Sequence, residues 1–137
     1  EPFIKEFKDK VDWMCISSHQ KLSEAFIEEF ADKVEWHLIS AKQKLSEDFI
    51  RKFADKVDWQ WISAYQVLSE PFIREFKDKV NWRYILGRQK VSLDFLVNIW
   101  NELQEDQKET VLESLGEQES LFRAKLLEKG GERKWQY

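Results

Sequence analysis

Residues 45–66 have the sequence LSEDFIRKFADKVDWQWISAYQ, and this stretch decides the fold because its pattern returns along the chain at a fixed interval. Its first tryptophan, Trp59, recurs every 23 residues. Its phenylalanines, Ile62 and Gln66 keep the same interval without a gap. The recurring residues include Trp13, Trp36, Trp59 and Trp82, and Phe3, Phe26, Phe49, Phe72 and Phe95. Self-similarity at one period of this length is typical of repeat architectures.

Each unit of the repeat predicts two short amphipathic helices. In residues 23–45, Ser23 is suited to cap the first helix, and Phe26 and Phe30 fall on one face of it. We expect this helix to end near residues 32–34. The second helix follows an Asp, Glu or Asn cap and buries Trp36 and Ile39. Helices of about ten residues are not stable alone in water, so neighbouring units must share a core. The prediction is an all-α fold of helix-turn-helix repeats stacked as an α-solenoid.

The regular pattern predicts three segments. Residues 1–91 form four tandem repeats, of which the first is truncated at its start; because the chain opens at Glu1 inside a repeat, we expect residues upstream of it. Residues 92–131 form a degenerate fifth repeat and a carboxyl-terminal helical cap, with helices over 106–115 and 117–129. Residues 132–137 form a flexible tail. The cap is expected to bury Val111, Leu112, Leu115, Leu121, Phe122, Leu126 and Leu127.

Composition excludes several classes of protein. The chain is 42% hydrophobic and 35% charged, which is typical of folded proteins. Its net charge of −4 argues against a general nucleic-acid binder, which needs a basic surface. Cys15 is the single cysteine, so no internal disulfide framework is possible and a reducing compartment is expected. No apolar run approaches the roughly 20 residues that span a bilayer, and no secretory signal is present.

Columns that stay constant between units have structural explanations. The tryptophans share a helix face with Ile16, Ile39, Ile62 and Ile85, which predicts that they belong to the core rather than to a stacking ladder for ligands. Gln20, Gln43, Gln66 and Gln89 are expected to bond backbone groups at the repeat junctions. Helix capping and ion pairing between repeats explain the recurring Asp-Lys pairs, which are Asp9-Lys10, Asp32-Lys33, Asp55-Lys56 and Asp78-Lys79.

Columns that vary between units are the candidates for recognition. The position two residues after each tryptophan holds Cys15, Leu38, Trp61 and Tyr84, and the position four residues further holds His19, Lys42, Tyr65 and Arg88. Residues at i and i+4 share a helix face, so these columns predict a ridge that is rich in the residue types of binding hot spots. An equally weighted interpretation is that the ridge packs against the following unit. The candidate partner-binding residues are Leu38, Lys42, Trp61, Tyr65, Arg83, Tyr84 and Arg88.

The sequence predicts no enzyme. Cys15 and His19 stand at i and i+4, a spacing that suits a nucleophile pair or half of a metal site, but no orienting acid or third ligand accompanies them. Gly-rich phosphate loops, Cys-x-x-Cys and His-Glu-x-x-His are all absent from the sequence. We therefore predict no catalytic, cofactor-binding or metal-binding residues and no cofactor.

The unit LSEDFIRKFADKVDW, closed by Ile62-Ser63 and Gln66, resembles the tandem LSExFIxxFxDKVxWxxIS helical repeats of proteins from large DNA viruses and bacteriophages. The resemblance covers residues 1–100. It implies a viral or phage origin, a helical repeat fold, no catalytic residues, and a scaffold that binds a protein, such as an inhibitor of a host defence protein, in the host cytoplasm. Two alternatives are a single-stranded nucleic-acid-binding repeat protein, in which the ridge stacks bases, and a structural virion or self-assembling component.

Overall fold

The computed structural model describes residues 12–130, and every regular element in that range is an α-helix or a short 3-10 helix. The chain divides into two compact units, residues 1–67 and residues 68–137. Within each unit, successive helices pack against one another, so the predicted all-α helical-repeat fold is confirmed. No helix in the described range is long and apolar enough to span a bilayer. Residues 1–11 and the predicted tail at 132–137 lie outside the described residues.

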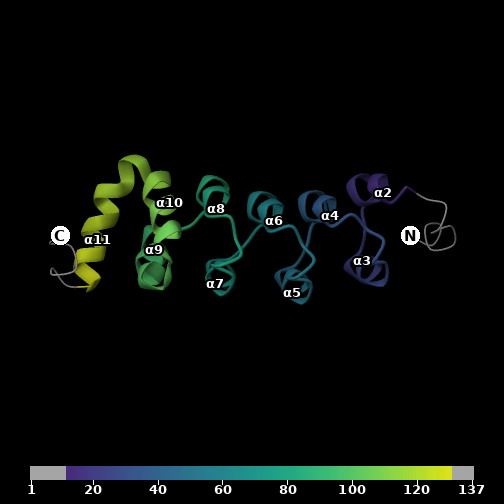
Figure 1. The fold of residues 1–137 in the computed structure, drawn as a ribbon, viewed down its shortest axis with the longest axis horizontal. Helices are drawn as coiled ribbons and strands as arrows, with labels where there is room; N and C mark the ends of the chain where they lie inside the picture. Colours follow the sequence, from purple (N-terminus) through teal and green to yellow (C-terminus); the bar gives the residue numbers. More distant parts are fainter. Residues whose placement is uncertain (1–11, 131–137) are drawn as a thin grey trace. The chain divides into compact units, whose positions relative to one another are not determined.

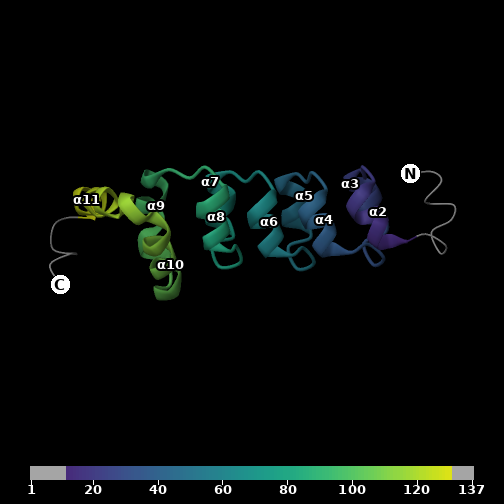
Figure 2. The same ribbon diagram turned by 90° about the horizontal axis from the view of Figure 1, so that it is seen from above.

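The first unit consists of helix pairs whose second helices lie side by side (Figures 1 and 2). α2 packs against α4, and α4 packs against α6. The helices are α2 (Trp13–His19), α3 (Glu24–Glu29), α4 (Trp36–Lys42), α5 (Glu47–Lys52) and α6 (Trp59–Tyr65).

The second unit begins with another helix pair and ends with longer helices (Figure 1). α10 packs against α8, and α11 packs against α9. Its elements are α7 (Glu70–Glu75), α8 (Trp82–Arg88), α9 (Leu93–Ile99), the 3-10 helix η1 (Trp100–Glu102), α10 (Glu105–Leu115), the 3-10 helix η2 (Gly116–Gln118) and α11 (Glu119–Gly130).

The first helix of a repeat is shorter than predicted. α3 ends at Glu29 rather than near residues 32–34, because the backbone of Phe30 leaves the helical conformation. The carbonyl of Phe30 then accepts hydrogen bonds from the backbone N–H groups of Lys33 and Val34, at 2.9 and 3.1 Å. This tight turn buries Val34 and leaves Lys33 exposed. The residues between the two helices therefore form a turn and not a last helical turn.

Helix caps recur with the repeat as the sequence predicts. The serine before each first helix accepts a hydrogen bond from the backbone N–H three residues later, as Ser46 does from Phe49 at 3.1 Å. The second helices are capped by the side chains of Asp12, Asp58 and Asn81. Glu35 occupies the same position before α4 without a capping hydrogen bond from its side chain.

The core of each unit is made of the recurring phenylalanines and isoleucines. Ile39, Ile50 and Ile62 have no solvent exposure, and Phe26 and Phe49 are buried. The recurring tryptophans lie at the margin of this core: Trp82 is buried, whereas Trp13, Trp36 and Trp59 are half-buried.

The half-buried position of the tryptophans follows from their contacts. The indole N–H of Trp36 donates to the carbonyl of Ala31 at 2.9 Å, which ties the second helix of a repeat to the turn before it. The indole ring packs against Phe49 and Phe53 of the next repeat, with centroid separations of 6.3 and 5.3 Å. Trp36 therefore joins two repeats, which agrees with its predicted structural role, although the residue is half-buried rather than buried.

The 23-residue register continues into the fifth repeat, although the Trp-x-x-Ile pattern has ended. α10 follows Gln104, which lies 23 residues beyond the cap residue Asn81, and α10 packs against α8 as α4 packs against α2. The backbone N–H of Gln104 donates to the side chain of Gln107 at 2.8 Å, which caps the helix. α10 buries Val111 and Leu115 in place of the missing tryptophan and isoleucine.

The last helix covers α9 through an aromatic contact. Phe122 is fully buried and meets the Trp100 ring edge-on at a centroid distance of 5.1 Å. Leu126 is buried as predicted, and Leu112 and Leu127 are half-buried. The prediction for Leu121 is wrong: it is 54% exposed, because the buried face of α11 runs through the residues that follow it.

Candidate binding surface

Two aromatic side chains on α6 form the clearest candidate site in the first unit. The rings of Trp61 and Tyr65 are stacked, with a centroid distance of 5.6 Å and an interplanar angle of 21°. Tyr65 is 51% exposed and Trp61 is half-buried. Because the two residues stand one helical turn apart, the helix itself holds the rings together. The pair is therefore an ordered aromatic surface that contacts solvent.

The predicted residues of the second repeat lie on the neighbouring helix. Leu38 and Lys42 occupy on α4 the positions that Trp61 and Tyr65 occupy on α6, and α4 and α6 pack together. Leu38 is half-buried, and Lys42 is exposed at the carboxyl-terminal end of its helix. The structure thus places the four residues predicted in this unit on adjacent helices at matching positions.

Val67 follows the stacked pair in the sequence as a further exposed apolar residue, and it was not identified from the sequence. Its side chain is 87% exposed. It stands two residues after Tyr65, and the residue between them, Gln66, has an extended backbone and a buried side chain. Neighbours of an extended residue point away from it, so Tyr65 and Val67 lie on the solvent side. We call Trp61, Tyr65 and Val67 the aromatic patch.

The sequence contains a signal for Val67 in the corresponding positions of the other repeats. Those positions hold lysine: Lys21, Lys44 and Lys90. The third repeat therefore has an apolar residue, Val67, where the other repeats have a lysine. Likewise it has Tyr65 where the second repeat has Lys42. Exposed apolar residues that lie together are candidates for an interaction site.

Charge is segregated around the aromatic patch. Residues 13–22, 36–45 and 59–67, which hold the second helices of the first unit and the segments after them, contain no Asp or Glu. They contain three exposed lysines, which are Lys21, Lys42 and Lys44. We call these three lysines the basic strip. Every acidic residue of residues 12–67 lies in a first helix, in a turn or at a helix cap.

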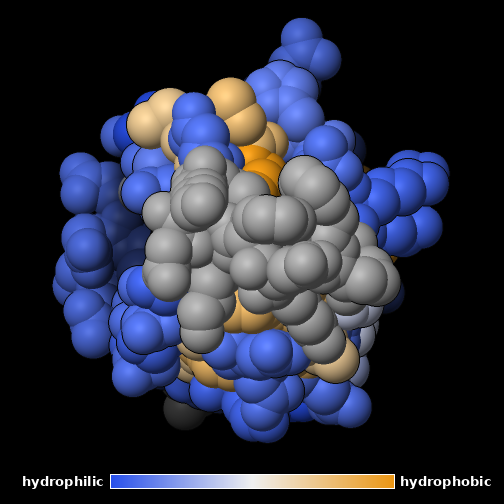
Figure 3. Space-filling model, turned by 90° about the vertical axis from the view of Figure 1, so that its right-hand side faces the viewer, coloured by the Kyte–Doolittle hydropathy of each residue, from blue (hydrophilic) through white to orange (hydrophobic). Residues whose placement is uncertain are grey.

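The coloured residues visible in Figure 3 are mostly hydrophilic, with a few hydrophobic residues among them. Met14 on α2 is 57% exposed and contributes a single apolar side chain. Isolated apolar residues of this kind are normal on protein surfaces. A stacked aromatic pair with a further exposed apolar neighbour, as on α6, is a different feature.

The predicted residues of the second unit lie on α8, beside α10. Tyr84 is half-buried, and its backbone N–H donates to Asn81 at 3.2 Å. Arg83 pairs with Glu113 of α10, with 3.6 Å between the guanidinium and the carboxylate. Arg88 is exposed at the end of α8. α10 packs against α8, and Arg83, which lies beside the ridge, contacts α10 through its ion pair with Glu113. The two interpretations of the ridge both stay predictions.

Cys15 and His19 lie one turn apart on α2, and the side chain of each has hydrogen-bond partners of its own. The Cys15 thiol donates to a carboxylate oxygen of Asp12 at 3.4 Å. This hydrogen bond, together with the negative charge of Asp12, raises the pKa of the Cys15 thiol. The His19 Nδ1 atom lies 3.3 Å from the carbonyl oxygen of Cys15 and 2.7 Å from the Ser18 hydroxyl. A raised thiol pKa disfavours the thiolate, which is the nucleophilic form.

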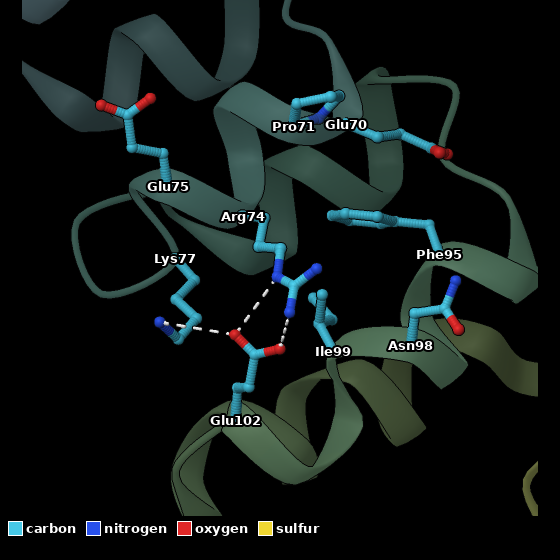
Figure 4. Close-up of a pocket in the computed structure, with 9 residues that line it drawn as sticks. All are labelled: Glu70, Pro71, Arg74, Glu75, Lys77, Phe95, Asn98, Ile99 and Glu102. Atoms are coloured by element: carbon cyan, nitrogen blue, oxygen red, sulfur yellow. Dashed lines mark hydrogen bonds and ion pairs between the residues drawn. The ribbon is translucent and has the colours of Figure 1, made fainter.

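No group of three His, Cys, Asp or Glu residues is placed to hold a metal ion within the part of the chain that the structure describes. A shallow pocket of about 560 Å³ lies between α7 and α9 in the second unit (Figure 4). It has no counterpart in the sequence predictions, because its walls come from two different repeats. Arg74 and Lys77 both face Glu102, with the Arg74 Nε atom 3.3 Å and the Lys77 Nζ atom 3.9 Å from one carboxylate oxygen (Figure 4). The two cations that line this pocket thus both pair with Glu102.

Comparison of the chain with protein-family models, with curated proteins and with solved structures found no match. The repeating helix pairs are established by the structure itself. The relationship to viral and phage repeats rests on the resemblance of the repeat sequence alone.

Proposed function

We propose that this chain is a non-enzymatic, protein-binding repeat scaffold of viral or phage type that engages a host protein, as an inhibitor of host defence would, in the host cytoplasm. The observation that carries the proposal is the aromatic patch, in which the stacked pair on α6 is followed by a further exposed apolar residue. The viral origin and the host partner are supported by the resemblance of the repeats.

The chemistry of the patch suits recognition of a protein. Trp and Tyr are enriched among the residues that dominate binding energy at interfaces. Trp61 and Tyr65 are already stacked on a helix, so little conformational entropy is lost when a partner covers them. A partner that covered the patch would remove the exposed apolar surface of Tyr65 and Val67 from water.

Binding rather than catalysis is supported by the chemistry of the described residues. The thiol of Cys15, the sequence's one cysteine, is bonded to a carboxylate that disfavours its reactive form. In the pocket between α7 and α9, the two cations Arg74 and Lys77 both pair with Glu102. Neither feature offers an activated nucleophile or an acid–base pair.

Single-stranded nucleic-acid binding is the second candidate, and one observation favours it. A stacked aromatic pair beside lysines is the arrangement on which bases stack while cations contact the phosphates. Such binding would weaken steeply as salt increases.

The proposal is tested by affinity purification from lysates of bacterial and eukaryotic cells, the two classes of host. The decisive variant is Trp61→Leu with Tyr65→Lys and Val67→Lys, which gives the third repeat the residues of the second (Leu38, Lys42 and Lys44) and therefore preserves the fold. The control is Leu121→Ala, which removes an exposed apolar residue elsewhere.

We expect the wild type and the Leu121→Ala variant to retain the same host protein and the triple variant to lose it. Retention of that protein by all three chains would contradict the role of the patch. Retention of no protein by the wild type would contradict the proposed function as a whole.

A further inference from the structure

We propose that the aromatic patch and the basic strip together bind an acidic, extended segment of a partner protein that carries an apolar anchor residue. This inference rests on the proposed protein-binding function and names the chemistry of the partner. The anchor contacts Trp61 and Tyr65, and the acidic side chains of the segment meet the lysines at the ends of α4 and α2.

The first step is the separation of charge in this unit. Residues 12–67 hold ten acidic residues against seven basic ones, yet the second helices and the segments that follow them hold no acid. The segments that carry these lysines are therefore basic in sequence, in a part of the chain whose total charge is negative. Complementary potentials steer association and select between partners, so this strip favours an acidic partner.

The second step is the position of the lysines relative to the patch. Lys42 is the last residue of α4, as Tyr65 is the last residue of α6, and the two helices pack side by side (Figure 2). Packed helices are about 8–10 Å apart. Lys44 follows Lys42 as Val67 follows Tyr65. The helix beside the aromatic patch therefore presents lysines at the positions that match Tyr65 and Val67.

The third step converts this spacing into a preference. An extended chain advances about 3.3 Å per residue, so about three residues span the distance between neighbouring helices. An acid about three residues from the apolar anchor would reach Lys42 or Lys44. A second acid about three residues further along would reach Lys21, which follows α2.

An acidic protein segment fits this surface better than a nucleic acid does. Nucleic-acid affinity comes largely from cations that neutralise phosphates. The third repeat, which holds the stacked rings, has Tyr65 and Val67 at the two positions where the second repeat has Lys42 and Lys44. Bases stacked on Trp61 would therefore have no cation from the same second helix beside their phosphates, whereas the exposed Val67 offers contact to an apolar side chain.

The test is selection from a random-peptide display library on the immobilised full chain. Peptides that also bind the Trp61→Leu, Tyr65→Lys, Val67→Lys variant are removed first. We expect enriched peptides to share an aliphatic or aromatic anchor with Asp or Glu about three residues away. A synthetic peptide with that motif is then measured by fluorescence anisotropy against the wild type and two double variants.

The two double variants carry the same change in net charge. Lys42→Gln with Lys44→Gln removes cations from the basic strip, whereas Lys33→Gln with Lys56→Gln removes exposed lysines from the turns after the first helices. We expect the first double variant to raise the Kd about three- to tenfold, since each exposed ion pair contributes a modest amount of binding free energy. We expect the second to leave the Kd within about twofold of the wild type.

Each other outcome overturns a specific claim. Enrichment of anchored peptides without acids would overturn the acidic preference and leave the proposed protein-binding function intact. Absence of any enrichment over the triple variant would overturn both. Binding of single-stranded oligothymidylate or oligouridylate more tightly than the selected peptide would assign the surface to nucleic acid instead.

Discussion

The side chain of Gln66 donates a hydrogen bond to the backbone carbonyl of Gln43, its own counterpart one repeat earlier, at 2.7 Å. It also donates to the carbonyl of Ser40 at 2.8 Å, and its oxygen accepts from the backbone N–H of Leu45 at 3.1 Å. Helix ends leave backbone groups without intrahelical partners. One buried amide therefore satisfies three such groups of the preceding repeat.

Removing this amide is expected to destabilise the chain strongly. In Gln66→Ala three buried backbone groups lose their partner, which costs about 2–4 kcal/mol of the free energy of unfolding because buried polar groups are expensive to leave unpaired. Urea unfolding followed by circular dichroism measures the loss. Gln20→Ala is the control, since Gln20 occupies the same column but is exposed, and its effect is expected to stay below about 0.5 kcal/mol. Equal effects of the two changes would contradict the role of the buried amide.

The cap of α4 offers a stabilising substitution. Glu35 makes no capping hydrogen bond, whereas Asp58 at the same position before α6 accepts one from Gln60 at 3.1 Å. The shorter side chain of Asp reaches the helix N–H groups better than Glu does. Glu35→Asp is therefore expected to raise the free energy of unfolding by about 0.5–1 kcal/mol, measured by urea unfolding. The reciprocal change Asp58→Glu should lower it by a similar amount; a loss of stability in Glu35→Asp would contradict the argument.

Asp12 is expected to control the reactivity of Cys15. The carboxylate accepts a hydrogen bond from the thiol and repels the thiolate, and both effects raise the pKa of Cys15. Asp12→Asn removes the charge and keeps a capping side chain, as Asn81 shows at the equivalent position. The alkylation rate of Cys15, followed against pH, should therefore rise at lower pH in the variant than in the wild type. An unchanged profile would show that the thiol does not sense Asp12.

The repeat and its helices were predictable because the sequence repeats what the packing repeats. Each buried Phe and Ile occupies one position of a 23-residue unit, so the periodicity reports the core directly. α10 was assigned to a cap and not recognised as the second helix of the fifth repeat. The position of the recurring tryptophan holds Glu105, and Val111 and Leu115 supply the buried contacts from a different register.

The buried serines show what a single sequence conceals. Ser17 and Ser40 have no exposure, and their hydroxyl oxygens accept hydrogen bonds from the backbone N–H groups of Glu35 and Asp58 in the following repeat, at 3.1 and 2.9 Å. Serine recurs after isoleucine in three repeats, which indicates a structural role. Its hydrogen-bond partner lies in another repeat, so only the structure identifies it. Of the candidate binding surface, Trp61 and Tyr65 were predicted from their residue types. Val67 departs from a column of lysines, but its exposure is what identified it.

Two glycines in the second unit should respond to alanine in opposite directions. Gly87 lies within α8, and a Cβ atom there would meet no other atom within 4 Å. The corresponding residues of the earlier repeats are Ala41 and Ala64, so the helix accepts a methyl group at this position. Glycine in a helix is less favourable than alanine because it loses more backbone entropy on folding. Gly87→Ala is expected to raise the free energy of unfolding by about 0.5–1 kcal/mol.

Gly116, the first residue of η2, provides the contrast. A Cβ atom would again meet nothing within 4 Å, so space does not distinguish the two sites. The backbone of Gly116 has φ of 54° and ψ of −118°, a conformation that residues with a side chain rarely adopt. Gly116→Ala is therefore expected to lower the free energy of unfolding by about 1–3 kcal/mol. Thermal and urea unfolding of both variants measure the difference. Stabilisation by both changes would mean that the chain between α10 and α11 adopts a different turn, and the placement of Phe122 against Trp100 would then need revision.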